Sequence, residues 1–304
     1  MNRKHDLVFW LFLTPVLIAF IMVIIIPFGI GIFYSFTNWS ATARAGQGIS
    51  MLGFTNFANS LKDPSFAWSF IMTTVFTIIN IALVNAAALA LALAVTSKLK
   101  LRNIYRTSFF VPNLIGGIIL GFIWQFIFNR GIPAIGGFIP LFANWANPEN
   151  LMLGRVSTAL FALSIVNTWQ YAGYIMMIYI AAIEGVPQEL YEAATIDGAN
   201  FHQRFRAIVV PMIAQAFTIT IFLTLVNSFK QFDVNVSLTS GGPSTIFAGK
   251  AVRGTELLAM NIFSTAFVGL KLAEAQARAL IFFLVLVVFT TIQVKVNKRK
   301  EIEL

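Results

Sequence analysis

Long apolar runs, separated by short polar segments, dominate the hydrophobic pattern of this chain. A transmembrane helix needs about 20 mainly apolar residues to cross roughly 30 Å of hydrocarbon, so each long run predicts one membrane span. Pro15 and Pro27 in the first run and Pro112 in the third are expected to kink their helices. The runs without a charged residue are Leu7–Phe36, Pro64–Ser97, Thr107–Asn129, Val156–Ile183 and Ala207–Phe229.

A sixth span is predicted near the C-terminus, where the charge-free run Ala279–Val294 is short. We expect this span to begin near Leu272 and to include Glu274 and Arg278, which are four residues apart on a helix and can form an ion pair near the interface. The apolar run Leu257–Leu270 is too short to span and is expected to be an interfacial or re-entrant piece. Six spans predict an all-α, polytopic membrane protein.

Composition supports a membrane protein and excludes several functional classes. Of the 304 residues, 58% are hydrophobic and 11% are charged, whereas a soluble domain is about half apolar. The chain has no Cys, which excludes disulfides, thiolate metal sites and a cysteine nucleophile. His5 and His202 lack ligand spacing, so we expect no metal site. The net charge is +9, but the basic residues lie between the apolar runs and do not form one stripe interleaved with aromatic residues. We therefore expect no nucleic-acid partner.

The basic residues predict the orientation of the chain in the cytoplasmic membrane. Six spans place residues 1–6, 98–106, 184–206 and the tail after Val294 on one side of the lipid bilayer. Those segments carry 12 Lys and Arg, against eight in the longer segments of the other side. Positive residues favour the cytoplasmic side, so both termini are expected in the cytoplasm.

The spans divide the chain into three parts. Residues 1–63 are expected to hold the first span, uncleaved because its apolar core is about twice a signal-peptide core, and an external loop. Residues 64–294 are expected to form a five-span core that contains the cytoplasmic loop 184–206. Residues 295–304 form a basic cytoplasmic tail.

The loop 184–206 departs from the basic pattern, because it carries four acidic and two basic residues. Pro187 can occupy the first turn of a helix, with Glu189 near the positive end of the helix dipole. Gly198 is expected to break that helix, and Phe201 begins a second apolar face. The loop is therefore predicted to be two short helices with a glycine turn. It is either a solvated connector, which composition alone favours, or a docking surface.

A motif in this loop favours docking. The string Glu192-Ala193-Ala194-x-x-x-Gly198-x9-Ile208-x-Val210-Pro211 resembles the EAA motif of the permeases of binding-protein-dependent ABC importers. In that motif E-A-A is followed after three residues by G, and after nine more by I-x-L-P. The one departure is Val210 at the Leu position, and it exchanges one apolar residue for another. As in the family, the string follows a fourth span and precedes a fifth.

Weaker similarities extend over most of the chain and resemble the maltose-type carbohydrate branch of this family. The matching segments are Arg106-x-x-Phe109-Phe110-Val111-Pro112, Leu52-Gly53-Phe54-x-Asn56-Phe57, Phe232-Asp233, Leu238-Thr239 and Gly241-Gly242-Pro243.

The resemblance implies a type I ABC importer permease fold with a coupling helix that seats in a groove of the ATPase. It implies that Glu192 pairs with a basic ATPase residue, and that Gly198 permits a tight turn. Ala193, Ala194, Asp197 and Pro211 belong to the same coupling string. The implied partners are a second homologous permease, two ATPase subunits, an extracytoplasmic solute-binding protein, a sugar substrate and membrane lipid.

Polar residues inside the fourth and fifth predicted spans fall on one face of each helix, at positions i, i+3, i+4 and i+7. Amides, hydroxyls and aromatic rings suit a neutral, hydroxyl-rich solute. The same residues can instead join helices by hydrogen bonds, and spacing alone favours neither function. The resemblance favours a sugar path, because Asn167-Thr168-Trp169 and Tyr174 look like the span that lines the sugar site in maltose-type permeases. The candidates are Asn167, Gln170, Tyr171, Tyr174, Thr224, Asn227, Ser228 and Gln231.

The chain contains no G-x4-G-K-[ST] phosphate loop and no catalytic motif, so no enzyme activity and no cofactor of its own are expected. ATP would bind to a partner subunit. The alternatives are an ABC permease for another neutral solute and an ion-coupled secondary carrier. Such carriers usually bury a titratable residue in mid-span, and the five charge-free runs hold none. The sequence does not specify which sugar is carried, or whether the partner permease binds it.

Overall fold

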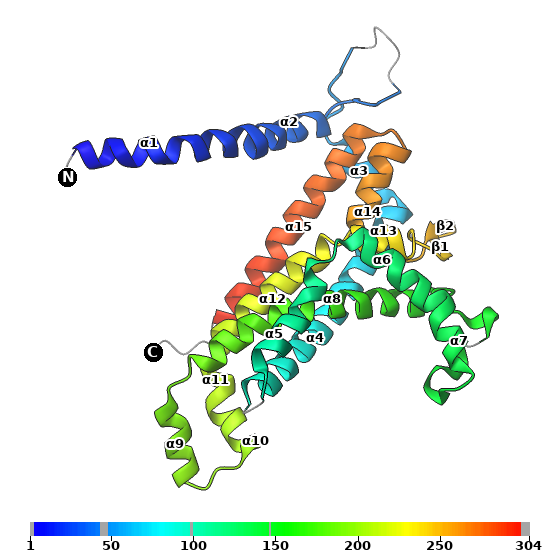
Figure 1. Ribbon diagram of the computed structural model, residues 1–304. Coiled ribbons are helices and arrows are strands. Elements are labelled where there is room, and N and C mark those ends of the chain that lie inside the picture. Colours follow the sequence, from blue (N-terminus) through cyan, green and yellow to red (C-terminus); the bar gives the residue numbers. More distant parts are fainter. Residues whose placement is uncertain (1–2, 43–47, 98–99, 146, 299–304) are drawn as a thin grey trace. The chain divides into compact units, whose positions relative to one another are not determined.

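The computed structural model describes residues 3–42, 48–97, 100–145 and 147–298, and most of them lie in helices (Figure 1). The all-α prediction is confirmed, apart from one short hairpin. The chain forms two compact units. The first unit is Met1–Asp63 with Ile262–Phe283, and the second unit is Pro64–Asn261 with Leu284–Leu304.

The first unit begins with an apolar helix that passes through α1 (Arg3–Phe20), a π-helical segment (Ile21–Ile25) and α2 (Ile26–Ser35). Residues Phe9–Ser35 are long and apolar enough to span a membrane, and none of their most apolar window is buried by the rest of the chain. A bilayer therefore has to cover this helix. The short helix α3 (Thr55–Lys62) follows, and Asn56 Nδ2 donates to the carbonyl oxygens of Ser35 and Thr37 at 2.8 Å each.

Helix α15 (Leu272–Lys298) supplies its first turns to the first unit and carries a buried charge cluster there. The predicted pair of Glu274 and Arg278 is confirmed, with Nη2 and Oε1 2.6 Å apart. Arg278 also contacts Asp63 Oδ2 at 2.5 Å, and its side chain is 5% exposed. The two carboxylates compensate the buried guanidinium.

A π-helical turn precedes each of three prolines in the apolar helices. A proline ring clashes with the carbonyl four residues earlier, and a wider turn removes that clash. In each case the residue before the proline donates its N–H to the carbonyl five residues back. The three bonds are Ile26 to Ile21 before Pro27, Ile132 to Ile127 before Pro133, and Val210 to Phe205 before Pro211.

The second unit is built around α4 (Pro64–Thr96), α8 (Val156–Glu184) and α12 (Ala214–Phe229), which pack against one another (Figure 1). Helix α5 (Arg102–Phe110) packs along α8. This close packing depends on small residues. A Cβ on Gly173 of α8 would overlap the carbonyl oxygen of Phe109 on α5.

The third predicted span, Thr107–Asn129, is wrong at its beginning. Helix α5 ends at Phe110, a 3-10 turn covers Val111–Leu114, and Ile115 is extended. Because Pro112 cannot donate a backbone hydrogen bond, it contributes a break where the sequence predicted a kink. The apolar helix then runs over Gly117–Gly136, through α6 (Gly117–Phe126), a π-helical segment (Ile127–Gly131) and α7 (Ile132–Gly136).

The fifth predicted span, Ala207–Phe229, is also not one straight helix. A helix begins before the predicted start, with α10 (Phe201–Arg204), and continues through a π-helical segment (Phe205–Val209) and α11 (Val210–Met212). Helix α12 follows at an angle of 70°.

Four helices in the described part of the chain are long and apolar enough to cross a membrane, and the bent pair ending in α12 is a fifth candidate. Helix α8 has 29 residues, about 43 Å at 1.5 Å per residue, but its polar residues lower its hydropathy. All six predicted spans therefore correspond to helical elements. The four are Phe9–Ser35, Pro64–Thr96, Gly117–Gly136 and Leu272–Lys298.

The remaining elements lie between the spans. They include α13 (Asp233–Leu238), which packs on α6, and an antiparallel hairpin of β1 (Ser244–Phe247) and β2 (Lys250–Arg253). The apolar run predicted to be too short to span forms a helix over Leu258–Val268, beginning with α14 (Leu258–Phe263). Its first residue is fully buried, so this end packs within the protein. Short 3-10 turns cover Pro140–Trp145 and Pro148–Asn150, and a π-helical segment covers Ser264–Val268.

Candidate functional site

The loop 184–206 forms the two short helices that the sequence predicts. Helix α9 (Gln188–Ile196) begins directly after Pro187, with Glu189 in its first turn, where a negative charge stabilises the helix dipole. Helix α10 follows after Asn200, whose side chain accepts from Gln203 N at 3.0 Å while Asn200 N donates to Gln203 Oε1 at 2.8 Å. This reciprocal capping box fixes where the second helix starts.

Gly198 ends α9 in the left-handed conformation, with φ of +73°. Gly198 N donates to Thr195 O at 3.1 Å and Ala199 N donates to Ala194 O at 2.9 Å, which is the Schellman pattern of a glycine-terminated helix. A residue with a Cβ would be strained here. The glycine in the EAA string is therefore required by backbone geometry.

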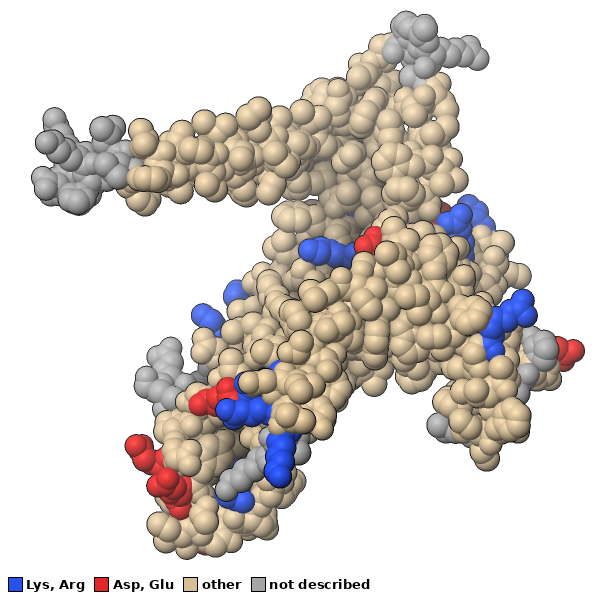
Figure 2. All heavy atoms as spheres, in the orientation of Figure 1, with Lys and Arg blue, Asp and Glu red and all other residues tan. Residues whose placement is uncertain are grey.

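Most of the coupling string lies open to solvent. Glu192, Ala193, Asp197 and Gly198 are exposed, while Ala194 and Pro211 are half-buried. On the face drawn in Figure 2, charged side chains gather at the end of the second unit that carries α9 and α10.

Two apolar side chains stand out beside these charges. Ile196 is 87% exposed and Phe201 is 67% exposed, so most of the apolar surface of each side chain faces solvent. Apolar side chains beside acidic groups on a short helix pair are typical of a surface that another protein covers.

The helix pair is held to the second unit through its inner face. Tyr191, Phe205 and Ile208 pack against the buried cluster of Val84, Tyr179 and neighbouring residues. Burial raises the pKa of Tyr191 above its ordinary value of 10.0, and Arg204 opposes that shift. The Tyr191 hydroxyl is therefore protonated at neutral pH.

The polar face of α12 points mainly at α4. Asn85 Nδ2 lies 3.3 Å from Thr224 Oγ1, and Asn80 Nδ2 lies 3.2 Å from Ser228 Oγ. Tyr179 of α8 joins this layer by donating to Asn85 Oδ1 at 2.9 Å. In the described structure, Thr224 and Ser228 thus make the helix-joining hydrogen bonds that were the alternative to a sugar path.

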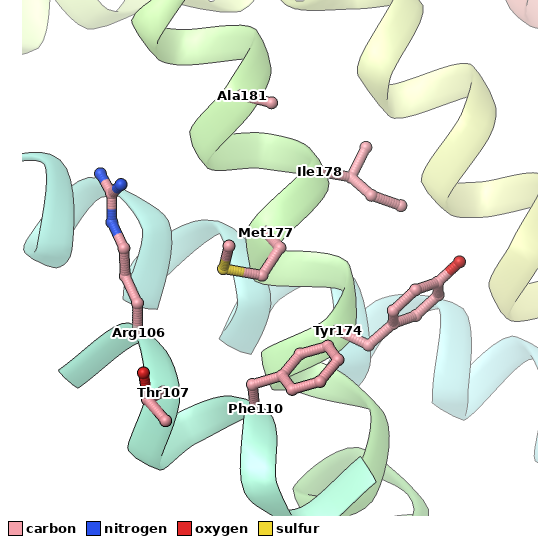
Figure 3. Close-up of a pocket in the computed structure, with 7 residues that line it drawn as sticks. All are labelled: Arg106, Thr107, Phe110, Tyr174, Met177, Ile178 and Ala181. Carbon is pink, nitrogen blue, oxygen red and sulfur yellow. The ribbon is translucent and has the colours of Figure 1, made fainter. Parts of the chain in front are cut away.

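The other candidates of the sugar path are divided between the core and its surface. Gln170 is buried and donates to Ile115 O at 3.1 Å, which holds the break in the third span. Asn167 Oδ1 and Gln231 Nε2 are buried without a hydrogen-bond partner among the described atoms. Tyr171, Tyr174 and Asn227 are half-buried. Tyr174 lines a groove with α5 (Figure 3).

Sequence reasoning missed the partners of these residues. Asn80 and Asn85 lie within an otherwise apolar span, so their polarity was a usable signal. Tyr179 carried no such signal, because tyrosine is common in membrane helices. Arg106 pairs with Glu184, a contact that only the packing of α5 on α8 creates. No cluster of His, Asp and Glu suited to a metal occurs in the ranges that the structure covers.

Comparison with known proteins identifies the family. The family described as "Binding-protein-dependent transport system inner membrane component" matches residues 86–302. The chain belongs to this family. The resemblance of the EAA string is thereby confirmed, and an ion-coupled secondary carrier is excluded.

Relatives align with this permease over nearly its whole length. It is 42% identical to the probable starch degradation products transport system permease protein AmyD of Thermoanaerobacterium thermosulfurigenes, over 99% of this chain and 97% of that protein. It is 28% identical to the multiple sugar-binding transport system permease protein MsmF of Streptococcus mutans, over 96% of each chain.

A solved structure shares the fold of the permease. A chain of a bacterial alginate ABC transporter, crystallised in complex with an alginate pentasaccharide-bound periplasmic protein, matches with a TM-score of 0.78 at 19% identity. The match covers 97% of this chain and 96% of the other. The predicted type I importer permease fold is confirmed.

Proposed function

We propose that this permease carries a sugar or oligosaccharide across the cytoplasmic membrane and depends on a separate ATPase for energy. The names of the relatives AmyD and MsmF support a carbohydrate cargo. The charge-free runs of the sequence support a neutral cargo, because charged solutes would favour charged residues along the path. Another neutral solute is the alternative.

The proposed assembly contains a second homologous permease, two ATPase subunits and an extracytoplasmic solute-binding protein. ATP binds and is hydrolysed in the ATPase subunits, consistent with the lack of a phosphate-loop motif in this sequence. Closure of the ATPase pair draws the coupling loops together. The spans then rock from an inward-facing to an outward-facing state. The binding protein then releases its sugar. Both termini lie in the cytoplasm, as the distribution of basic residues supports.

One observation carries the coupling proposal. The EAA string lies on an exposed helix that ends at Gly198 with φ of +73°, and Ile196 and Phe201 project beside its acids. A partner that covers them would bury apolar surface at about 25 cal/mol per Å². Glu192 would supply a charge partner for a basic ATPase residue.

Separate substitutions of Glu192 and of Gly198 test this proposal. Glu192→Lys and Gly198→Asp are expected to abolish sugar uptake and assembly with the ATPase, while membrane insertion is unchanged. Uptake of radiolabelled maltooligosaccharides and co-purification of the ATPase measure the two effects. Normal transport in both variants would refute the coupling function.

Glu189→Lys is the matched control, because it makes the same charge change on the same helix outside the EAA string. It is expected to keep most of the uptake. If Glu189→Lys were as harmful as Glu192→Lys, the charge of the loop or the stability of α9 would matter, and the motif would not.

A further inference from the structure

A groove runs along the surface of the second unit between α5 and α8, with a volume of about 570 Å³. That volume is in the range of about 300–1,000 Å³ found for small-molecule sites. Its walls are apolar, formed chiefly by Phe110, Met177, Ile178 and Ala181. Figure 3 shows the aromatic rings of Phe110 and Tyr174 at one end, and Ala181 with the guanidinium of Arg106 toward the other.

The groove lies within the thickness of one leaflet of a bilayer. Tyr174 is ten residues from Glu184, the last residue of α8, and ten residues rise about 15 Å. Half of a hydrocarbon core of roughly 30 Å is the same distance. Because Glu184 is the first residue of the loop proposed to be cytoplasmic, the groove lies in the cytoplasmic half of the bilayer.

The charge at the inner end of the groove suits an anion. Arg106 is bound on one side by Glu184, its side chain is 18% exposed, and its buried Nε has no acceptor within the described residues. Lys100 and Arg102, both exposed, precede it without an intervening acid. Basic sites between membrane helices on the cytoplasmic side attract anionic lipid head groups.

We propose that this groove binds an anionic phospholipid of the inner leaflet. Its phosphate contacts the Arg106 guanidinium, and an acyl chain lies against Phe110, Met177 and Ile178. The phosphate competes with Glu184 for Arg106. Because Glu184 directly precedes the helix pair α9–α10, a lipid that breaks the ion pair of Arg106 and Glu184 affects the position of the coupling loop. The proposal rests on the cytoplasmic orientation given under the proposed function.

Native mass spectrometry of the assembled transporter tests the proposal, using equal concentrations of added phosphatidylglycerol and phosphatidylcholine. The wild type is expected to retain phosphatidylglycerol preferentially. Arg106→Gln is expected to lower that affinity about fivefold, the effect of one basic residue near a lipid surface. Glu184→Gln is expected to raise it, because the competing carboxylate is gone.

Both of those variants break the same ion pair, so a folding defect would lower lipid binding in both. Ala181→Phe fills the groove without changing charge and is expected to lower retention. Lys298→Gln removes an exposed charge at the end of α15 and should leave retention unchanged.

Equal retention of the two lipids by the wild type, or no loss in Arg106→Gln, would overturn the proposal. So would loss of the second permease from Ala181→Phe with unchanged lipid, since the groove would then be a protein interface. Lipid retention requires neither sugar nor ATP. A transporter that imports sugar but retains no anionic lipid contradicts only this proposal, and the converse result contradicts only the proposed function.

Discussion

Single residues in this permease are constrained by what their backbone must approach or adopt. Gly198 and Gly173 illustrate two different constraints. Gly198 has open space around its Cβ position but a positive φ, whereas Gly173 faces the backbone of α5. The first position was recognisable from the motif. The second became evident only when α5 and α8 were packed together.

Replacing Gly173 by alanine is expected to destabilise the protein by about 1–3 kcal/mol, the cost of overpacking a filled interface. The new Cβ meets the backbone oxygen of Phe109, which no rotamer change can move away. Thermal unfolding of the detergent-purified permease measures the effect.

Gly29→Ala is the control for this substitution, because Gly29 is also helical and nothing lies within 4 Å of its Cβ position. It is expected to be neutral or slightly stabilising. Equal losses in both variants would show that the contact with α5 does not determine the result.

At the scale of elements, hydrogen bonds between polar side chains join the helices of the second unit, whose other contacts are mainly apolar. Thr220 donates to the hydroxyl of Tyr179 at 2.8 Å, and that hydroxyl donates to Asn85. Bonds of this kind between membrane helices contribute about 0.6 kcal/mol on average. The layer therefore orients α4, α8 and α12 more than it stabilises them.

Tyr179→Phe is expected to lower stability by about 1 kcal/mol, because two hydrogen bonds are lost and Asn85 Oδ1 is left buried. Tyr174→Phe serves as the control, since the hydroxyl of Tyr174 makes no hydrogen bond to the residues described. The thermal unfolding midpoints of the two variants, compared with that of the wild type, measure the difference. A larger loss in Tyr174→Phe would contradict the role given to the polar layer.

The charge cluster on α15 gives a second prediction at this scale. Arg278→Met removes the cation that contacts both Asp63 and Glu274, and breaking a buried pair costs about 3–5 kcal/mol. Lys271→Met removes a cation that also contacts Glu274, at 3.2 Å, but is 64% exposed. That substitution should cost less than about 1 kcal/mol. Similar stability of the two variants in thermal unfolding would show that Arg278 is not the central charge.

For the whole molecule, the absence of Cys from the sequence allows a direct test of orientation. Lys250→Cys, in the hairpin, is expected to react with a membrane-impermeant maleimide in intact spheroplasts. Lys298→Cys is expected to react only in inside-out vesicles. Both positions are exposed, so reactivity reports the side of the membrane. The reverse pattern would invert the proposed topology.

The sequence by itself determined the class of the protein, because the bilayer thickness imposes a length on every apolar run. Six apolar segments, the ion pair of Glu274 and Arg278, and the helix–glycine–helix form of residues 184–206 were all predicted. These features depend on local spacing. The coupling role and the cargo remain predictions from the motif and from relatives.

Only the tertiary structure decided where spans break and which polar residues face one another. The third span begins at Gly117, after a break at which Gln170 of α8 donates to Ile115 O, and the fifth bends by 70° after Met212. It also paired Thr224 with Asn85 and Arg106 with Glu184. Helical periodicity gives the face on which a residue lies, but the partner on that face comes from another part of the chain.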